Sequence, residues 1–296
     1  MSSKKTIKIL VPGSKSIAAR AIILSSIYDK KIKLKNIPKC DDTKYLINAL
    51  EKLKIFLKNE KKEINSFSKN ITIFTGNAGT TTRFLTAFFA LKIVLKQKRT
   101  VTIYGNKRMN ERPIKDLTSA LNQIGSKIET LGGKDKDCPP IKIYPSELIG
   151  GKVKIRGDIS SQYISALLMI AKFTKKKTII EIEKKLCSKP YIKITEKLIK
   201  EFKNKNLKEF IIESDASSAS YIGEYAVLNP NKKIILENIT KKSIQGDIKF
   251  LEYLSKMGCK ISEHKNCTEI EGTGIIKPLN TVDMNATQDL VMTFEV

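Results

Sequence analysis

The chain has 296 residues, with 55 Lys and Arg against 30 Asp and Glu and a single His, so its formal charge is +25. Hydrophobic residues make up 41% and charged residues 29%, a balance typical of a folded globular protein, and the length allows two domains. No apolar run reaches the roughly 20 residues of a membrane-spanning helix, and the start lacks the apolar stretch of a signal peptide. These features argue against the membrane and secreted classes, and we expect a cytoplasmic protein.

The excess of positive charge comes from lysine. Only six of the 55 basic residues are Arg, and the Lys residues are scattered in short clusters along the chain. Proteins that bind nucleic acid use Arg for base readout and aromatic side chains for stacking, whereas this chain has no Trp. We therefore interpret the charge as a solvated basic surface and expect no specific nucleic-acid partner.

In chain order, the first recurring pattern is a β-like run, a turn of small or polar residues, and an apolar helix. Its first copy runs from a strand at 6–11 through Pro12-Gly-Ser-Lys-Ser into a helix at 17–28. Later copies lie at 71–95, 152–173 and 210–228, and a fifth begins at 281 and continues to 296. Strands that lead directly into helices are typical of the α/β class.

Between these copies lies a second kind of helix, with apolar residues at i, i+3, i+4 and i+7. It is predicted at 45–53, 114–124, 191–202 and 248–257. Asp or Pro stands at the helix starts and Gly follows two of the helices, as capping predicts. A short β-like pair follows each helix. The sequence therefore predicts repeated β-α-β-α-β-β units with a period of roughly 60 to 80 residues.

The turns before helices of the first kind have the features of an anion site. Their small hydroxyl and amide residues leave backbone N–H groups unpaired at a helix N-terminus, where the helix dipole also favours negative charge. Four Arg residues, which can bind carboxylate or phosphate bidentately, lie in or next to these segments: Arg20, Arg83, Arg108 and Arg112. Several such turns predict a cleft for a polyanion, whereas an Asp at one helix start, taken alone, is equally typical of a cap.

The five cysteines and the single His264 show no recognisable metal or disulfide spacing. The chain contains no C-x-x-C pair, and no nucleophile signature accompanies His264. We therefore expect reduced thiols, no metal site and no Ser-His-Asp triad.

Seven segments follow one another along the chain: Pro12-Gly-Ser-Lys-Ser with Arg20, Gly76-Asn-Ala-Gly-Thr with Arg83, Arg108-Met-Asn-Glu-Arg-Pro-Ile, Ser160-Ser-Gln, Ser188-Lys-Pro-Tyr-Ile, Asp215-Ala-Ser-Ser-Ala-Ser-Tyr and Gln245-Gly-Asp. Taken together, they resemble the 3-phosphoshikimate 1-carboxyvinyltransferase (EPSP synthase) family over essentially the whole chain. The resemblance implies a two-domain α/β enolpyruvyl-transferase fold, with β-α-β-α-β-β units arranged about a pseudo-threefold axis. Residues 14–213 would form a complete three-unit domain, and residues 1–13 with 214–296 a second, incomplete domain.

The resemblance also implies a reaction. The carboxyvinyl (enolpyruvyl) group of phosphoenolpyruvate would be transferred to the 5-hydroxyl of shikimate 3-phosphate with release of phosphate, on the route to chorismate and the aromatic amino acids. Both substrates are small polyanions, and neither a cofactor nor a metal is implied.

Residue roles follow from the positions that match the family motifs. The residues implied to bind shikimate 3-phosphate are Lys15, Ser16, Arg20, Ser160, Ser161, Gln162, Ser188 and Asp289, with Tyr191 nearby. Those implied to bind phosphoenolpyruvate are Lys15, Asn77, Gly79, Arg112 and Gln162, with Asp42 lining the site. Asp289 is implied to be the catalytic base that accepts the hydroxyl proton, and Lys15 is the second implied catalytic residue. Cations would stabilise the tetrahedral intermediate.

The chain also departs from the family pattern. Asn285-Ala-Thr-Gln-Asp lacks the usual Pro before the aspartate, and the segment between Tyr191 and Asp215 is short. The chain ends seven residues after Asp289, so the rest of unit five and all of unit six, roughly 110 to 130 residues, are expected to be missing. We expect a monomer, or a chain completed by a separate C-terminal polypeptide.

Two alternatives stay open at this point. The chain could be an inactive or partner-dependent truncated remnant of the enzyme. The other is UDP-N-acetylglucosamine carboxyvinyltransferase, which shares the fold but opens its first helix with Lys-Asn and uses a loop Cys as acid. Here Lys15 is followed by Ser16, and residues 105–116 contain no Cys, which argues against this second alternative.

Overall fold

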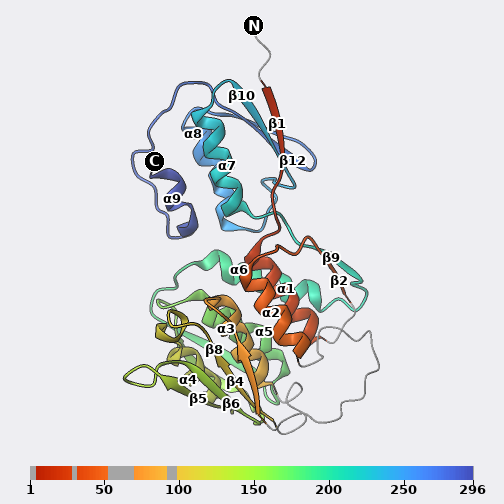
Figure 1. Ribbon diagram of the computed structural model, residues 1–296, viewed down its shortest axis with the longest axis vertical. Coiled ribbons are helices and arrows are strands. Elements are labelled where there is room, and N and C mark those ends of the chain that lie inside the picture. Colours follow the sequence, from red (N-terminus) through yellow and green to blue (C-terminus); the bar gives the residue numbers. More distant parts are fainter. Residues whose placement is uncertain (1–4, 29–31, 53–69, 92–98, 296) are drawn as a thin grey trace.

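The computed structural model describes residues 5–28, 32–52, 70–91 and 99–295, whose side chains form two hydrophobic cores. The larger core draws on residues between Ile17 and Ile212, and the smaller on Val11 together with residues between Ala219 and Leu290. Figure 1 shows them as two lobes, the larger below and the smaller above. Each lobe therefore has its own interior.

The chain crosses between the lobes twice, and the two crossings lie side by side. Gly13 and Ser214 form an isolated antiparallel bridge, and the Asp215 amide donates to the Pro12 carbonyl at 2.8 Å. A Cβ on Gly13 would lie 1.9 Å from the carbonyl oxygen of Asn36, so this crossing requires glycine.

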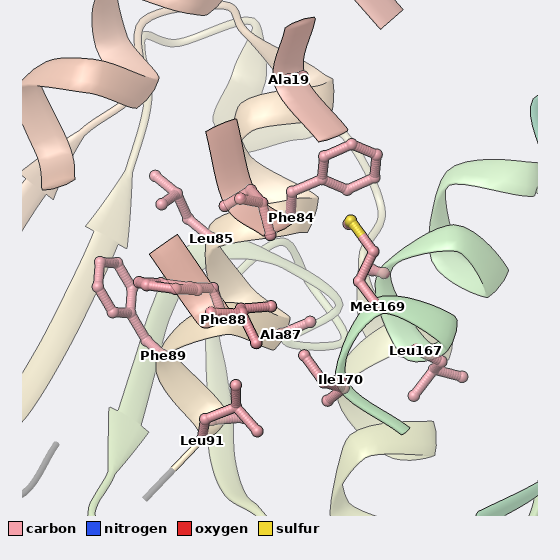
Figure 2. Close-up of a cluster of buried hydrophobic side chains, with 14 of the residues drawn as sticks. Ala19, Phe84, Leu85, Ala87, Phe88, Phe89, Leu91, Leu167, Met169 and Ile170 are labelled. Atoms are coloured by element: carbon pink, nitrogen blue, oxygen red, sulfur yellow. The ribbon is translucent and has the colours of Figure 1, made fainter. Parts of the chain in front are cut away.

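Helices of the first kind form the inside of the larger lobe. They are α1 (Lys15–Ile27), α3 (Gly79–Ala90) and α5 (Ser161–Ile170). All three are apolar nearly all round and buried on most faces, as expected for interior helices. Figure 2 shows Phe84 of α3 in one buried cluster with Ala19 of α1 and Met169 of α5.

Helices of the second kind are amphipathic and fill the spaces between the inner helices. They are α2 (Asp41–Lys52), α4 (Lys115–Gln123) and α6 (Lys189–Phe202). The α2 helix packs on α1 and α3, α4 packs on α3 and α5, and α6 packs on α5 and α1. This cyclic order is the pseudo-threefold arrangement that the family resemblance implied.

Among the described residues, the larger lobe contains three sheets. The order β3-β4-β6-β5 joins β3 (Asn70–Phe74), β4 (Thr100–Tyr104), β6 (Cys138–Tyr144) and β5 (Lys127–Gly132). Two parallel pairs join β7 (Gly151–Arg156) to β8 (Thr178–Glu183) and β2 (Lys33–Lys35) to β9 (Glu209–Ile211). The strand pair predicted to be short after α6 is reduced to the three-residue β9.

The smaller lobe contains one four-stranded sheet and three helices. The sheet order β1-β10-β12-β11 joins β1 (Lys5–Leu10), β10 (Lys232–Glu237), β12 (Cys267–Glu271) and β11 (Lys260–Glu263). The helices of the smaller lobe are α7 (Ala216–Leu228), α8 (Phe250–Lys256) and α9 (Val291–Phe294). Short 3-10 turns occur in both lobes. The larger lobe contains η1 (Met109–Glu111) and η2 (Ala171–Phe173), and the smaller lobe contains η3 (Gly246–Lys249) and η4 (Gln288–Leu290). The N-terminal strand β1 thus pairs with β10 within the smaller lobe.

Four copies of the predicted strand–turn–helix pattern are confirmed, with two corrections. The inner helices begin earlier than predicted, α3 at Gly79 and α7 at Ala216, because the Ser- and Thr-rich turns are themselves the first helical turns. Residues 281–284 form no strand but place Val282 and Met284 against the smaller core. The predicted helix ends at 53, 95 and 296 fall outside the described residues. Within the described ranges, the structure contains no helix with both the length and the apolar character needed to span a bilayer.

Candidate active site

A cavity of about 410 Å³ is lined by residues at the starts of α1, α5 and α6 in the larger lobe and by the turn η4 in the smaller lobe. All eight residues implied for shikimate 3-phosphate line it: Lys15, Ser16, Arg20, Ser160, Ser161, Gln162, Ser188 and Asp289. A neighbouring cavity of about 860 Å³ shares Lys15, Ser16 and Asp289. Residues spread over most of the chain are thus gathered at one place.

The local backbone explains why the cavity suits an anion. Lys15 is the first residue of α1, and Ser161 is the first residue of α5. Ser160 caps α5, with its hydroxyl accepting from the Gln162 amide at 3.3 Å. Helix N-termini present N–H groups and the positive end of the helix dipole, which stabilise bound phosphate or carboxylate.

Lys15 is the exposed cation of the cavity. Its Nζ lies 3.8 Å from Oδ2 of Asp42, and its side chain is half exposed. An exposed ion pair at this distance is weak, so the ammonium group can exchange Asp42 for a bound anion at little energetic cost.

Arg20 is buried in the wall of the cavity. Only 1% of its surface is exposed, and burial lowers its pKa from 12.5 to about 10, which leaves it charged at neutral pH. Its guanidinium donates to neutral oxygens: Thr195 Oγ1 at 2.7 Å, the Ser16 carbonyl at 2.8 Å, Ser165 Oγ at 3.1 Å and the Tyr191 carbonyl at 3.3 Å. Because none of these acceptors is a carboxylate, the positive charge of Arg20 is left to act on the cavity.

A second positive cluster lies at the start of α3. A Cβ on Gly79 would lie 2.7 Å from Nη1 of Arg112 and 2.8 Å from Nη1 of Arg83, so glycine lets both guanidinium groups approach the helix N-terminus. Arg83 donates to Gln162 Oε1 at 2.6 Å, and Gln162 Nε2 donates to Thr80 Oγ1 at 3.1 Å. Burial, together with the charge of Arg112, lowers the pKa of Arg83. Gln162 thereby connects this cluster to the cavity.

The residues implied for phosphoenolpyruvate divide into two groups. Lys15 and Gln162 line the cavity, whereas Gly79, Arg112 and Asn77 lie beside it at the start of α3 and line neither cavity. Asn77 is exposed in the turn that precedes the helix.

Asp289 faces the cavity from the smaller lobe. Its Oδ2 accepts a hydrogen bond from the Tyr191 hydroxyl at 2.6 Å, and the neighbouring Gln288 accepts from Ser188 Oγ at 3.0 Å. The amide of Thr287 closes a turn onto the Met284 carbonyl at 2.9 Å. The turn that carries Asp289 therefore forms without the proline that the family usually has.

Sequence reasoning missed a buried acid behind Asp289. Asp247 is 5% exposed and accepts a hydrogen bond from Ser217 Oγ at the start of α7. Burial, reinforced by the charges of Asp289 and Asp215, raises its pKa to about 6. The segment Gln245-Gly-Asp contributed to the resemblance, but nothing in the sequence indicated that its carboxylate is buried.

Comparisons with known proteins show similarity over nearly the whole chain. The family model described as EPSP synthase (3-phosphoshikimate 1-carboxyvinyltransferase) matches residues 2–296. The chain is 39% identical to the 3-phosphoshikimate 1-carboxyvinyltransferase of Buchnera aphidicola subsp. Cinara cedri, over 98% of this chain and 71% of that protein. It is 35% identical to that of Pasteurella multocida, over 97% and 70%. An EPSP synthase structure from Acinetobacter baumannii shares the fold, with a TM-score of 0.73 and 18% identity over 97% of this chain and 71% of that one.

Proposed function

The chain belongs to the 3-phosphoshikimate 1-carboxyvinyltransferase (EPSP synthase) family, transferases of the shikimate pathway, and we propose that its cavity between the lobes is where the carboxyvinyl group of phosphoenolpyruvate is transferred to shikimate 3-phosphate. The observation that carries the proposal is the gathering of eight implied ligands in one cavity. These residues come from three helix starts of the larger lobe and one turn of the smaller lobe.

In the transfer, the 5-oxygen of shikimate 3-phosphate forms a bond to C2 of phosphoenolpyruvate while C3 takes up a proton, which gives the tetrahedral intermediate. Loss of a proton from C3 then restores the double bond as the bond from C2 to the phosphate oxygen breaks and phosphate leaves. Asp289 accepts the proton that the hydroxyl loses, because its carboxylate faces the cavity. The anionic tetrahedral intermediate is stabilised by Lys15 and by the helix N-termini around it.

The two positive clusters divide the substrates between them. Arg20, Ser160, Ser161, Gln162 and Ser188 surround shikimate 3-phosphate. Phosphoenolpyruvate is held by Lys15 and Gln162 on the cavity side and by Asn77, Gly79 and Arg112 at the start of α3. Support comes from the two guanidinium groups that converge there, since such groups bind phosphate and carboxylate bidentately.

The two lobes are proposed to be domains, with residues 14–213 in one and residues 1–13 with 214–296 in the other. The separate hydrophobic cores support these boundaries, as does the paired crossing at Gly13 and Ser214. The substrates would then bind between domains, where clefts commonly form. We also propose a cytoplasmic location.

Phosphate release by the purified chain tests the function. Release should require both phosphoenolpyruvate and shikimate 3-phosphate, and UDP-N-acetylglucosamine should not replace the latter. Asp289→Asn should lower the rate at least about 100-fold, because it removes the general base. Asp283→Asn is a matched control on the same segment, and its rate should be unchanged. Equal rates in the two variants would refute the assignment of Asp289.

A second candidate is catalysis that depends on another polypeptide. Three side chains at helical spacing on α7, Tyr221, Tyr225 and Leu228, are 50%, 41% and 56% exposed, although the inner helices of the larger lobe are buried on most faces. The chain spans 71% of the length of its Buchnera relative. Phosphate release that appears only after adding a polypeptide matching the rest of that relative would favour this candidate over catalysis by a monomer.

A further inference from the structure

The N-cap and first turn of α6 contact the turn η4 through two side-chain hydrogen bonds. Tyr191 Oη donates to Asp289 Oδ2 at 2.6 Å, and Ser188 Oγ donates to Gln288 Oε1 at 3.0 Å. The donors belong to the larger lobe and the acceptors to the smaller lobe. The proposed base is therefore held by a residue of the opposite lobe.

Contacts from Thr195 and Arg20 hold Tyr191 in place. Its carbonyl accepts hydrogen bonds from Thr195 Oγ1 at 2.8 Å and from Arg20 Nη2 at 3.3 Å, and the Arg20 guanidinium lies 5.9 Å from the centre of its ring. Burial raises the pKa of Tyr191, so the hydroxyl keeps its proton and stays a donor at neutral pH. The donor to Asp289 is thus anchored by these contacts and protonated at neutral pH.

Backbone packing fixes the same junction. A Cβ on Gly246 would lie 2.7 Å from the carbonyl oxygen of Ala286 and 2.8 Å from Cβ of Pro190, so the start of η3 fits only as glycine between η4 and α6. Ser188, which precedes α6, has a left-handed backbone with φ of 49°. Three segments that are far apart in sequence meet here in one tight arrangement.

We propose that Tyr191 is a positioning residue for Asp289. By engaging Oδ2, the Tyr191 hydroxyl fixes the orientation of the carboxylate and leaves Oδ1 to accept the proton of the substrate hydroxyl. The contact also makes delivery of the base depend on the approach of the two lobes. The inference rests on the proposed function in one respect, the role of Asp289 as proton acceptor.

Tyr191→Phe removes this hydroxyl and little else. A hydrogen bond to a charged group that orients the base should be worth about a 10- to 100-fold fall in kcat, while KM for shikimate 3-phosphate changes less than about threefold. Tyr144→Phe is the matched control, since Tyr144 Oη donates to Glu129 Oε2 at 3.0 Å on the exposed sheet of the larger lobe. Its kinetics should match the parent protein. A rise in KM with unchanged kcat would mean that Tyr191 binds substrate instead, and would overturn the proposal.

A double-mutant cycle tests the contact without any substrate. Tyr191→Phe and Asp289→Asn should shift the urea unfolding midpoint by amounts that do not add in the double variant, because both alter one hydrogen bond. Additive shifts would overturn the inference. If the parent chain released no phosphate while the cycle showed coupling, the proposed function would fail and the contact between Tyr191 and Asp289 would stand.

Discussion

Arg20→Ala should cost much of the stability of the larger lobe, although sequence reasoning treated Arg20 only as a ligand. The guanidinium makes four hydrogen bonds to neutral oxygens, each worth about 1.5 to 3 kcal/mol for a charged donor. Burial of the charge opposes this gain: a fall in pKa from 12.5 to about 10 corresponds to about 3 kcal/mol. With each bond at the low end of its range, the variant should lose about 3 kcal/mol of unfolding free energy.

Urea unfolding at pH 7 measures this loss. The matched control is Arg156→Ala, because Arg156 is paired with Asp158 at the exposed surface, where solvent screens the pair, and its loss should change stability little. Calorimetry at a urea-free condition where Arg20→Ala stays folded should also show weaker binding of shikimate 3-phosphate. Equal losses of stability in the two variants would refute the view that the buried guanidinium organises the wall of the cavity.

Three further predictions concern other positions. Since Asp247 has its pKa raised to about 6 in the folded protein, its contribution to stability is complete below about pH 4 and lost as the pH rises through 6. Asp247→Asn should therefore match the parent at pH 4 and unfold at higher urea at pH 8, and an unchanged midpoint at pH 8 would contradict this. Gly13→Ala forces a Cβ against the Asn36 carbonyl and should lower the unfolding free energy by about 3 kcal/mol in the same assay, whereas a fall below about 0.5 kcal/mol would show that the crossing can relax. Arg83→Met removes the donor to Gln162 Oε1 and should raise KM for phosphoenolpyruvate about tenfold. The substitution should cost little stability, because Arg83 Nε is buried without a hydrogen-bond partner among the described residues. An unchanged KM would count against the role of Gln162.

The repeat made the order of the elements predictable from sequence. Apolar periodicity identified the two kinds of helix, because interior helices are apolar nearly all round whereas helices of the second kind are apolar on one face. The predicted first residues of the helices were less accurate than the predicted order of the elements. Thr80 and Ser217 read as turn residues, yet both lie in the first turns of helices. Hydroxyl residues favour the cap and the first turn equally, so composition alone could not separate the two.

Sequence could gather the site residues but could not assign the contacts between them. Motif order placed Arg20, Tyr191 and Asp289 in one site, whereas the hydrogen bonds that join them depend on how α1 packs on α6 and on how the two lobes pack. Tyr191 lies 171 positions from Arg20 and 98 from Asp289, and no local pattern encodes either distance. The burial of Arg20 explains why its second, structural role was not predicted from sequence. The same guanidinium that sequence reasoning assigned to a substrate also anchors the tyrosine that holds the base, so a change at Arg20 should impair orientation of Asp289 as well as binding.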